Sequence, residues 1–547
     1  MSDTHIMNPS LWRSIFSLRM TPLIGCIAGG VAILLLTQGH PSGGYLSALV
    51  ILIALSILGL YDLIQTEHSV LRNYPITAHL RFLLEDIRPE VRQYFLEDET
   101  QGYPFSRNKR AVIYQRAKQN LDKRPFGTQL DVYEEGFEWL SHSIAPLAVG
   151  SHDFRVRVGG PACRQPYDAS LFNISAMSFG ALSANALLAL NAGAKSGGFA
   201  HNTGEGGLSP YHQVHGGDLI WEIGSGYFGC RTPDGRFDPD SFAQQARVDQ
   251  VKMIEIKLSQ GAKPGHGGLL PAAKVSAEIS RIRDIPMGED CVSPAAHSAF
   301  STPVELLQFV QTLRDLSGGK PVGFKLCIGH PREFLAICKA MLETGITPDF
   351  ITVDGKEGGT GSAPLEFMDH IGMPMREGLS FVHHALTGIG LRDQIRIAVS
   401  GKIATGFDIA RASALGADWC YSARGFMFAL GCIQSLKCHT DRCPTGVATQ
   451  DAARARALVP SLKAERVKNY HHSTMTALAE LIAAAGVTHP RDLQARDFYW
   501  RVSENQIMTL DQLYPQPVAG AFLNGDVDDR LAHAWREARA DSFRAAD

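Results

Sequence analysis

The chain has 547 residues, of which 45% are hydrophobic and 20% are charged. Lysine and arginine number 52 and aspartate and glutamate 55, so the formal net charge is −3. This composition excludes a broadly disordered chain, and the charge balance gives no reason to expect a nucleic-acid partner.

Two uncharged apolar runs lie near the N-terminus, at residues 23–36 and 45–61, and the turn-rich residues 37–44 separate them. With their flanks, each run approaches the roughly 17–25 residues that a helix needs to cross a bilayer. We therefore predict a transmembrane hairpin within residues 1–64. The alternative is a signal peptide followed by a buried core helix, but no small-residue cleavage site follows the first run.

Arginines flank this hairpin on both sides. They are Arg13 and Arg19 before the first run, and Arg72, Arg81, Arg88 and Arg92 after the second. The positive-inside rule then places both ends of the hairpin in the cytoplasm. We predict a multi-pass protein of the inner (cytoplasmic) membrane, with its catalytic domain in the cytoplasm.

Residues 65–164 interleave acidic and basic side chains with a helical period. We predict a juxtamembrane helical collar that packs on the domain that follows. Binding of its basic residues to anionic lipid is the alternative.

In residues 165–455, short apolar runs alternate with helical stretches. The strand candidates are residues 171–177, 198–202, 253–257, 322–328, 350–353, 395–400 and 418–423. The helix candidates include residues 183–194, 301–315, 331–344 and 405–415. Strands that alternate with helices predict an α/β fold with a parallel sheet, and seven or eight such units favour a closed TIM (β/α)8 barrel. Residues 456–547 are predicted as a C-terminal helical region.

Glycine-rich or charged loops follow five of the predicted strands. They occupy residues 202–207, 260–268, 354–361, 400–402 and 423–425. In a barrel, these loops meet at the carboxyl end of the strands, where the chemistry takes place. Glycine lets the backbone approach an anion or a flat ring closely, and Lys402 and Arg424 in the last two loops predict a phosphate site. Two ordinary strand-to-helix turns are the alternative there.

Several polar residues stand at or just beyond predicted strand ends, namely Lys257, Gln260, Lys263 and Lys325. A lysine inside an apolar strand, such as Lys325, is costly to bury without a partner. We interpret it as a cation near a flavin, where it would stabilise the reduced anion. Pairing with a core carboxylate is the alternative. Glu205 lies among glycines, and it either steers an amine or imine or only orders its loop.

Seven of the ten cysteines stand alone, but Cys432, Cys438 and Cys443 form a C-x5-C-x4-C pattern followed by proline. This spacing predicts iron–sulfur ligation by thiolates, and three ligands suggest a 3Fe–4S cluster that lacks one corner iron. A zinc site with His439 as fourth ligand is the alternative.

Five segments together carry a family resemblance. They are SAMSFGALS (175–183), HNTGEGG (201–207), EIKLSQGAKPG (255–265), DGKEGGTGSAPL (354–365) and GCIQSLKCHTDRCPTGVATQD (431–451). They resemble the synthase domain of glutamate synthases, and the whole chain resembles the membrane-anchored, FMN-binding members of that family. The resemblance implies a TIM barrel with FMN and a 3Fe–4S cluster. It also implies reductive amination of 2-oxoglutarate, or a related keto acid, to glutamate by hydride transfer from reduced FMN.

The same resemblance assigns roles to individual residues. It implies that FMN is held by Ala176, Met177, Ser178, Lys325, Gly358, Gly359, Gly401, Ala423, Arg424 and Gly425. The catalytic candidates are Glu205, Lys257, Gln260 and Lys263. The substrate candidates are Arg283, Ser293 and His266. The cluster ligands are Cys432, Cys438 and Cys443.

Three departures from the family pattern modify these expectations. Leu269 replaces a glutamine that contacts the keto acid, and Tyr227 replaces a common arginine, so we expect weaker use of 2-oxoglutarate unless His266 supplies the contact. Met1-Ser2-Asp3 leads into the hairpin without the nucleophilic cysteine of a glutaminase domain, so we expect ammonia or an amine from another source. Residues after about 456 lack a second flavin or nucleotide motif, so a separate protein should donate or accept electrons.

Two other functions remain open from the sequence. One is a membrane dehydrogenase that oxidises an amino acid and passes electrons to a partner. The other is a non-catalytic membrane scaffold that has kept the barrel, although the three clustered cysteines and Lys325 speak against it.

Overall fold

The computed structural model describes residues 17–545. The chain divides into two compact units, which meet in sequence between Asp98 and Glu99. We describe the first as the hairpin unit and the second as the barrel unit, each by itself.

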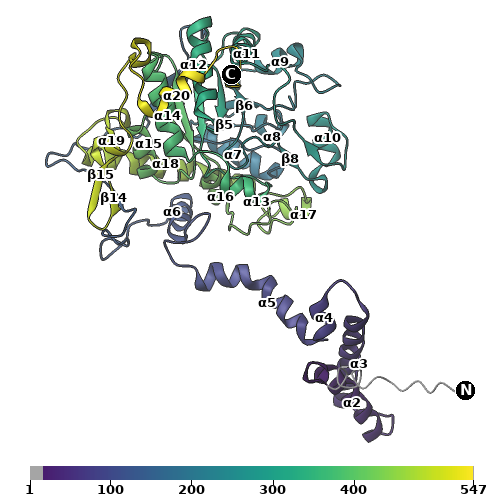
Figure 1. The fold of residues 1–547 in the computed structure, drawn as a ribbon. Coiled ribbons are helices and arrows are strands. Elements are labelled where there is room, and N and C mark those ends of the chain that lie inside the picture. Colours follow the sequence, from purple (N-terminus) through teal and green to yellow (C-terminus); the bar gives the residue numbers. More distant parts are fainter. Residues whose placement is uncertain (1–16, 546–547) are drawn as a thin grey trace, which may run out of the picture. The chain divides into compact units, whose positions relative to one another are not determined.

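The hairpin unit consists of helices. They are η1 (Leu18–Met20), α2 (Thr21–Leu36), α3 (Gly43–Ile64), α4 (Ser69–Asn73), α5 (Thr77–Val91) and the π-helical turn η2 (Arg92–Leu96). Helices α2 and α3 pack against each other as an antiparallel pair (Figure 1). A Cβ atom on Gly59 would lie 2.7 Å from Leu23 Cδ1, so glycine at this position lets the Leu23 side chain pack closely on α3.

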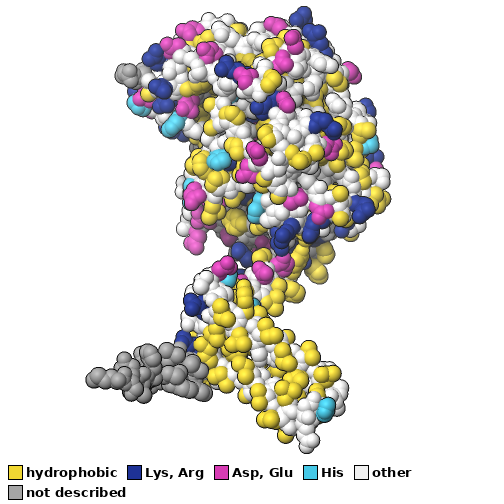
Figure 2. Space-filling model, turned by 90° about the vertical axis from the view of Figure 1, so that its right-hand side faces the viewer, with side chains coloured by type: hydrophobic (Ala, Val, Ile, Leu, Met, Phe, Trp, Pro, Cys, Tyr) yellow, Lys and Arg dark blue, Asp and Glu magenta, His cyan; other side chains and the backbone are white. Residues whose placement is uncertain are grey.

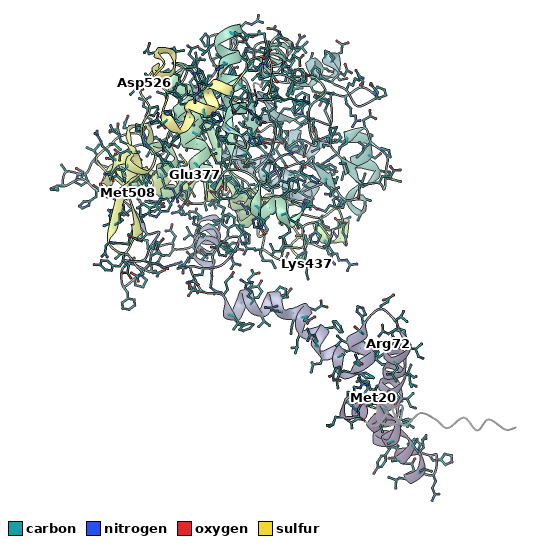
Figure 3. The ribbon with its side chains drawn as sticks, viewed as in Figure 1. Met20, Arg72, Glu377, Lys437, Met508 and Asp526 are labelled. Carbon is teal, nitrogen blue, oxygen red and sulfur yellow. The ribbon has the colours of Figure 1, made fainter. Side chains whose placement is uncertain are left out.

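The hairpin's ends are held together on the side away from its turn. Arg19 Nη1 donates to Asn73 Oδ1 over 3.0 Å, near the positions of Met20 and Arg72 in Figure 3. The buried Asp62 accepts from the Ile76 backbone N–H at 2.9 Å and contacts the His79 ring at 2.9 Å. These bonds fix the chain reversal between α3 and α5.

Both long helices of this unit are long and apolar enough to cross a membrane, over Leu18–Leu36 and Gly43–Ile64. Figure 2 shows their surface covered largely by hydrophobic side chains. Among the described residues, Leu36 is 81% exposed and Ile57 is 62% exposed, which is unusual for the core helices of a globular domain. Arg13, used in the topology prediction, lies outside the described residues.

Eight parallel strands close the barrel. In barrel order they are β4 (Phe172–Ile174), β5 (His201–Asn202), β6 (Leu219–Ile223), β7 (Val251–Lys257), β10 (Val322–Leu326), β11 (Phe350–Asp354), β12 (Arg396–Ser400) and β13 (Trp419–Ser422), which pairs again with β4. The predicted TIM barrel is thus confirmed.

Helices surround this barrel (Figure 1). They are α7 (Ala184–Gly197), α8 (Pro210–Gln213), α9 (Pro239–Ala246), α10 (Ala277–Arg283), α11 (Pro303–Leu316), α12 (Pro331–Thr344), α13 (Leu365–His370), α14 (Met375–Gly388), α15 (Gly406–Ala414), α16 (Arg424–Leu430), α17 (Ala452–Ala455) and α18 (Pro460–Ala484). Capping boxes begin three of them, with Ser209 and His212 before α8, Thr302 and Glu305 before α11, and Thr405 and Asp408 before α15, so these starts are set by local sequence.

The remaining elements decorate the barrel. They are α6 (Arg107–Lys118), β1 (Glu138–Leu140), the β2–β3 ribbon (Arg155–Val158 and Tyr167–Ser170), the β8–β9 ribbon (Leu269–Leu270 and Cys291–Val292), β14 (Phe498–Ser503), β15 (Gln506–Thr509), α19 (Leu510–Leu513), η6 (Ala521–Asn524), α20 (Asp529–Glu537) and the short 3-10 turns η3 (Ala272–Lys274), η4 (Pro490–Asp492) and η5 (Ala495–Asp497). Helix α6 packs on α16 and α18.

The structure differs from the sequence-based expectations in three places. The predicted collar is not one helical layer, because α4 and α5 belong to the hairpin unit and α6 to the barrel unit. Strand β1 also forms a sheet with β14 and β15, which gives the C-terminal region a β component. All seven predicted strands are present, but β6 was missed. Its five residues are all buried, including Glu222, so it shows no alternating pattern.

Candidate active site

All eight strands run in parallel, so the five loops singled out from the sequence lie at one end of the barrel. They follow β5, β7, β11, β12 and β13. This end is where parallel barrels assemble their active sites.

A carboxylate and an ammonium group stand at the centre of this end. Lys257 Nζ donates to Glu205 Oε1 at 2.7 Å and to Gln260 Oε1 at 2.7 Å. Ser293 Oγ lies 3.5 Å from Glu205 Oε2. The structure therefore brings together four residues predicted from separate segments. They come from the β5 and β7 loops and from the residues after β9.

Burial would raise the pKa of Glu205, but the attraction of Lys257, helped by Arg283 and Lys263, outweighs it and lowers this pKa to about 2. Glu205 is therefore an anion throughout the physiological range. Its space is closely defined, because a Cβ on Gly224 would lie 2.7 Å from Glu205 Oε2 and one on Gly268 would lie 2.3 Å from Oε1.

Two further cations face this group. Arg283 is 5% exposed and donates from Nη2 to the Phe179 carbonyl at 2.9 Å, and its guanidinium lies 5.2 Å from the Phe228 ring centre. Its Nε has no hydrogen-bond partner among the described residues. Lys263 donates to the Ser362 carbonyl at 2.9 Å, and burial together with Lys257 lowers its pKa to about 8. The site thus holds more positive than negative charge, which suits a carboxylate substrate.

Tyr227 and Leu269, which depart from the family pattern, and the nearby His266 each contact residues other than Glu205 and Lys257. Tyr227 is fully buried, and its hydroxyl accepts from the Ala299 N–H at 3.1 Å and contacts His297 Nδ1 at 3.1 Å. Leu269 pairs with Val292 in the β8–β9 ribbon. His266 contacts its neighbouring Gly267 carbonyl through Nδ1, and the described residues show no bond from it to the group around Glu205.

His297 is a site residue that the sequence analysis missed. Its Nε2 lies 2.9 Å from the Lys257 carbonyl, and burial lowers its pKa to about 4, so the ring is neutral. A single histidine in the segment SPAAHSAF carries no motif, and only the fold shows that it supports Lys257.

The barrel interior contains a second charged group, built on Lys325 of β10. Its Nζ forms an ion pair with Glu222 of β6 and lies 3.9 Å from Glu255 Oε2 of β7. Asn202 Nδ2 and Thr352 Oγ1 donate to the two Glu255 oxygens at 2.7 and 2.6 Å. Lys325 is therefore paired with core carboxylates, which was the alternative interpretation.

In this interior group, the Glu255 carboxyl binds a proton near neutral pH. Burial raises the pKa of Glu255 to about 7, with Lys325 opposing and Glu222 adding to the rise. The pKa of Lys325 is raised, because the carboxylates outweigh its burial. Two acids and one lysine thus lie within the barrel with close to zero net charge when Glu255 is protonated.

The last two loops hold two cations, Lys402 and Arg424, that form no ion pair with a carboxylate among the described residues. Arg424 makes one side-chain hydrogen bond, from Nη2 to the Glu357 carbonyl, and Lys402 makes none among the described residues. Burial lowers the pKa of Arg424 to about 10, while burial and then Arg424 lower the pKa of Lys402. Two adjacent cations with spare donors favour an anion between them, as a phosphate group would provide.

Glycines make room next to these cations. A Cβ on Gly359 would lie 2.8 Å from Arg424 Nε, and one on Gly401 would lie 2.8 Å from Met375 Cβ. Residues 176–178 also run closely over a glycine, since a Cβ on Gly204 would lie 2.8 Å from the Ser178 nitrogen. The loops around Lys402 and Arg424 therefore fit a phosphate, and Gly204 lets its loop pack closely on residues 176–178.

The three clustered cysteines follow α16 and are free thiols. They are close enough for each to influence the ionisation of another. The pKa of Cys443 is lowered, since bonds from Thr445 and nearby backbone N–H groups outweigh its burial. Within residues 17–545, no three His, Cys, Asp or Glu side chains converge on one metal ion.

The family model described as "Conserved region in glutamate synthase" matches residues 164–488, more than half of the chain. This chain belongs to the glutamate synthase family. The match covers the whole barrel and residues 432–443, which carry the three clustered cysteines and are called the cysteine loop below. It confirms the resemblance inferred from the sequence motifs and the assignment to glutamate synthase-like oxidoreductases.

Curated relatives in the glutamate synthase family show the same relationship. The chain is 39% identical over 496 residues to the Glutamate synthase large subunit-like protein YerD of Bacillus subtilis, covering 83% of this chain and 94% of that protein. It is 37% identical over 322 residues to the Archaeal glutamate synthase [NADPH] of Methanocaldococcus jannaschii, covering 59% of this chain and 60% of that protein. The chain thus spans about three fifths of the archaeal relative.

Among solved structures, a mutant flavocytochrome b2 with pyruvate bound shares 13% identity and gives a TM-score of 0.41, covering 82% of this chain and 90% of that one. The fold assignment here stands on the closed order of eight parallel strands.

Proposed function

We propose that this glutamate synthase family member is a membrane-anchored FMN and iron–sulfur oxidoreductase. It reductively aminates 2-oxoglutarate or a related keto acid with ammonia or an amine. The observation that carries the proposal is the group of Glu205, Lys257 and Gln260, faced by Arg283 and Lys263, at the same barrel end as the unpaired Lys402 and Arg424.

FMN would be held at the carboxyl end of the barrel by the residues that the family resemblance names. Lys402 and Arg424 would bind its phosphate, and the backbone of residues 176–178 and of Gly358, Gly359 and Gly401 would line it. When bound, FMN would supply the hydride for the reaction. The thiolates of Cys432, Cys438 and Cys443 would hold a 3Fe–4S cluster, which would pass electrons singly from a separate donor protein.

The residues of the chain bind and orient the reactants. Arg283 and Lys263 attract the carboxylates of the keto acid. Glu205 remains ionised, so it stabilises a cation rather than donating a proton. This suits an ammonium ion, or the iminium formed when ammonia adds to the keto carbon and water leaves. Lys257 holds Glu205 and Gln260 in place. Addition of a hydride to the iminium carbon would then give the amino acid.

An enzyme assay tests this function directly. The purified full chain, reduced anaerobically, should be reoxidised by 2-oxoglutarate together with ammonium, and glutamate should accumulate in step. Methylamine in place of ammonium tests an amine as the nitrogen source. If the reduced protein is inert to keto acids but glutamate reduces the oxidised protein rapidly, the chain is an amino-acid dehydrogenase instead. A colourless protein after gentle extraction would indicate a scaffold.

We expect substrate binding to weaken above about pH 8. Lys263 has a pKa of about 8, so its charge is complete well below that pH and is lost as the pH rises through it. One unit above the pKa, about a tenth of the ammonium form remains, so the KM for 2-oxoglutarate should rise up to about tenfold by pH 9. Steady-state assays across this range measure the change.

The matched variants for this pH dependence are Lys263→Met and Lys320→Met. Lys263→Met should show a high KM that does not change with pH. Lys320 also has a pKa of about 8, but it donates to the Ala246 and Val248 carbonyls away from Glu205. A pH dependence that survives in Lys263→Met and disappears in Lys320→Met would contradict the assignment.

We further propose that the hairpin unit anchors the protein in the cytoplasmic membrane. The exposure of the apolar side chains on α2 and α3 supports this, because water is a poor solvent for such a surface. Arg72, Arg81 and Arg88 after α3 favour cytoplasmic placement of that end.

The anchor predicts a definite topology. In intact cells, a membrane-impermeant thiol reagent should label His40→Cys in the turn between α2 and α3. Glu67→Cys, after α3, should be labelled only once the membrane is permeabilised. Release of the unmodified protein by high salt without detergent would argue against two membrane spans.

A further inference from the structure

A segment that precedes the family-matched region lies against the candidate phosphate site. Phe105 is 2% exposed, and the Arg424 guanidinium carbon lies 4.8 Å from the centre of its ring. Two residues earlier, the centre of the Tyr103 ring, which is largely exposed, lies 5.6 Å from Lys402 Nζ. One short stretch of chain thus places aromatic faces on both cations that lack carboxylate partners.

The same segment is bonded to the cysteine loop. The Gln434 amide accepts from the Phe105 N–H at 3.1 Å, and it donates to the Phe105 and Tyr103 carbonyls at 3.3 and 3.4 Å. Tyr114 Oη donates to the Cys432 carbonyl at 2.5 Å.

Gln434 is buried in the cysteine loop and has an unusual backbone conformation, which its hydrogen bonds to Tyr103 and Phe105 help to hold. It is 8% exposed, its φ is +58°, and its own N–H lies 3.4 Å from Cys432 Sγ. A non-glycine residue in the left-handed region carries a conformational cost, so the surrounding bonds must hold it there.

An aromatic ring is a suitable neighbour for a cation that must bind an anion. The ring face stabilises the cation and excludes water, but it uses none of the N–H donors. A carboxylate in the same place would occupy those donors and compete with a phosphate. The side chain of Phe105 therefore keeps Arg424 buried while its donors stay available.

The Phe428 ring of α16 packs against both Phe105 and Tyr114. Its ring centre lies 5.3 Å from that of Phe105 and 5.9 Å from that of Tyr114. Helix α16 begins at Arg424 and ends just before the cysteine loop, so the same packing supports both predicted cofactor sites.

We propose that residues 103–114 form a strap that closes both cofactor sites. The strap retains the FMN phosphate through Tyr103 and Phe105, and it fixes the loop of Cys432 through Gln434 and Tyr114. It lies before residues 164–488, which the family model matches. The cofactor part of this proposal rests on the proposed function.

Cofactor release from the purified full-length holoprotein tests the first half of the proposal. Tyr103→Ala and Phe105→Leu should release FMN about tenfold faster, as seen by the rise in free-flavin fluorescence after dilution. Tyr103→Phe keeps the ring and should behave like the parent protein. Phe126→Ala removes a fully exposed ring elsewhere and should also have no effect. Unchanged release from both Tyr103→Ala and Phe105→Leu would overturn this half.

Hydrogen exchange tests the second half without depending on flavin. In Gln434→Ala and Tyr114→Phe, the amides of residues 432–436 should exchange at least about tenfold faster, because the bonds that hold the loop are gone. Parent-like exchange in both variants would overturn the strap as a support of the loop. If the parent protein carries no flavin, the proposed function fails, and loop exchange alone decides whether the strap exists.

Discussion

Replacing Lys325 with methionine should destabilise the barrel unit by about 3–5 kcal/mol, the usual cost of leaving a buried charge without its partner. Lys325 is the cation that faces Glu222 and Glu255 inside the barrel. Methionine fills a similar volume, so the loss would come from the carboxylates rather than from a cavity. Urea unfolding of the full chain in detergent, followed by tryptophan fluorescence, measures the effect.

The loss in Lys325→Met should depend on pH in a definite direction. Lys325 opposes the rise in the pKa of Glu255, so without the ammonium group this pKa will lie still further above its unfolded value of about 4.3. A carboxyl whose folded pKa is raised costs stability as the pH rises from the unfolded value to the folded one. The variant should therefore be closest to the parent at acidic pH and weakest above neutrality.

Two comparisons make this result interpretable. Lys320 is also a buried lysine, but it donates to backbone carbonyls only, so Lys320→Met should cost about 1–3 kcal/mol. Its pKa is about 8, so this cost should stay constant from acidic to neutral pH, where Lys325→Met loses stability. The double variant Lys325→Met with Glu222→Gln should recover part of the loss. If Lys325→Met is as stable as the parent at neutral pH but loses FMN, Lys325 serves the cofactor rather than the barrel.

Replacing Cys438 with serine should remove nearly all cluster iron, together with the visible absorbance and paramagnetic signal of the cluster. Iron–sulfur clusters are held by thiolates, and a site with three protein ligands has none to spare. Flavin should be retained in part, because the phosphate site is built from other loops. Iron analysis and electron paramagnetic resonance on the purified protein provide the measurement.

Cys163→Ser is the matched control for the cluster variant. Cys163 is a partly buried thiol that donates to the Gly319 carbonyl, and it stands outside the cysteine loop. Its replacement should leave iron content and the paramagnetic signal unchanged. Full iron content in Cys438→Ser would show that the ligand assignment is wrong.

Much of the fold was predictable because local sequence and global architecture agree. The strand–helix alternation predicted the barrel, and seven strands and the helix at Pro331–Thr344 lie where the pattern placed them. The glycine loops were recognisable because close approach of the backbone requires glycine. The structure explains why glycine is needed at Gly224 and Gly268, because a Cβ at either position would collide with the Glu205 side chain.

Other features depend on contacts between distant segments and could not be read from the sequence. Strand β6 carries Glu222, whose partner Lys325 stands 103 residues later. His297 supports Lys257 from an unmarked loop. Residues 65–164 were expected to form one layer because their charges alternate throughout, yet the division between the two units falls at residue 98.

The charged group inside the barrel also bears on how the chain folds as it is synthesised. Glu222 and Glu255 are direct cross-strand neighbours on β6 and β7, whereas Lys325 arrives with β10. A growing chain that ends before β10 would hold two facing acids with no counter-charge. At neutral pH, repulsion between these two carboxylates would oppose the closure of such a half-barrel. Closure of the barrel would then wait until β10 brings Lys325 next to Glu222.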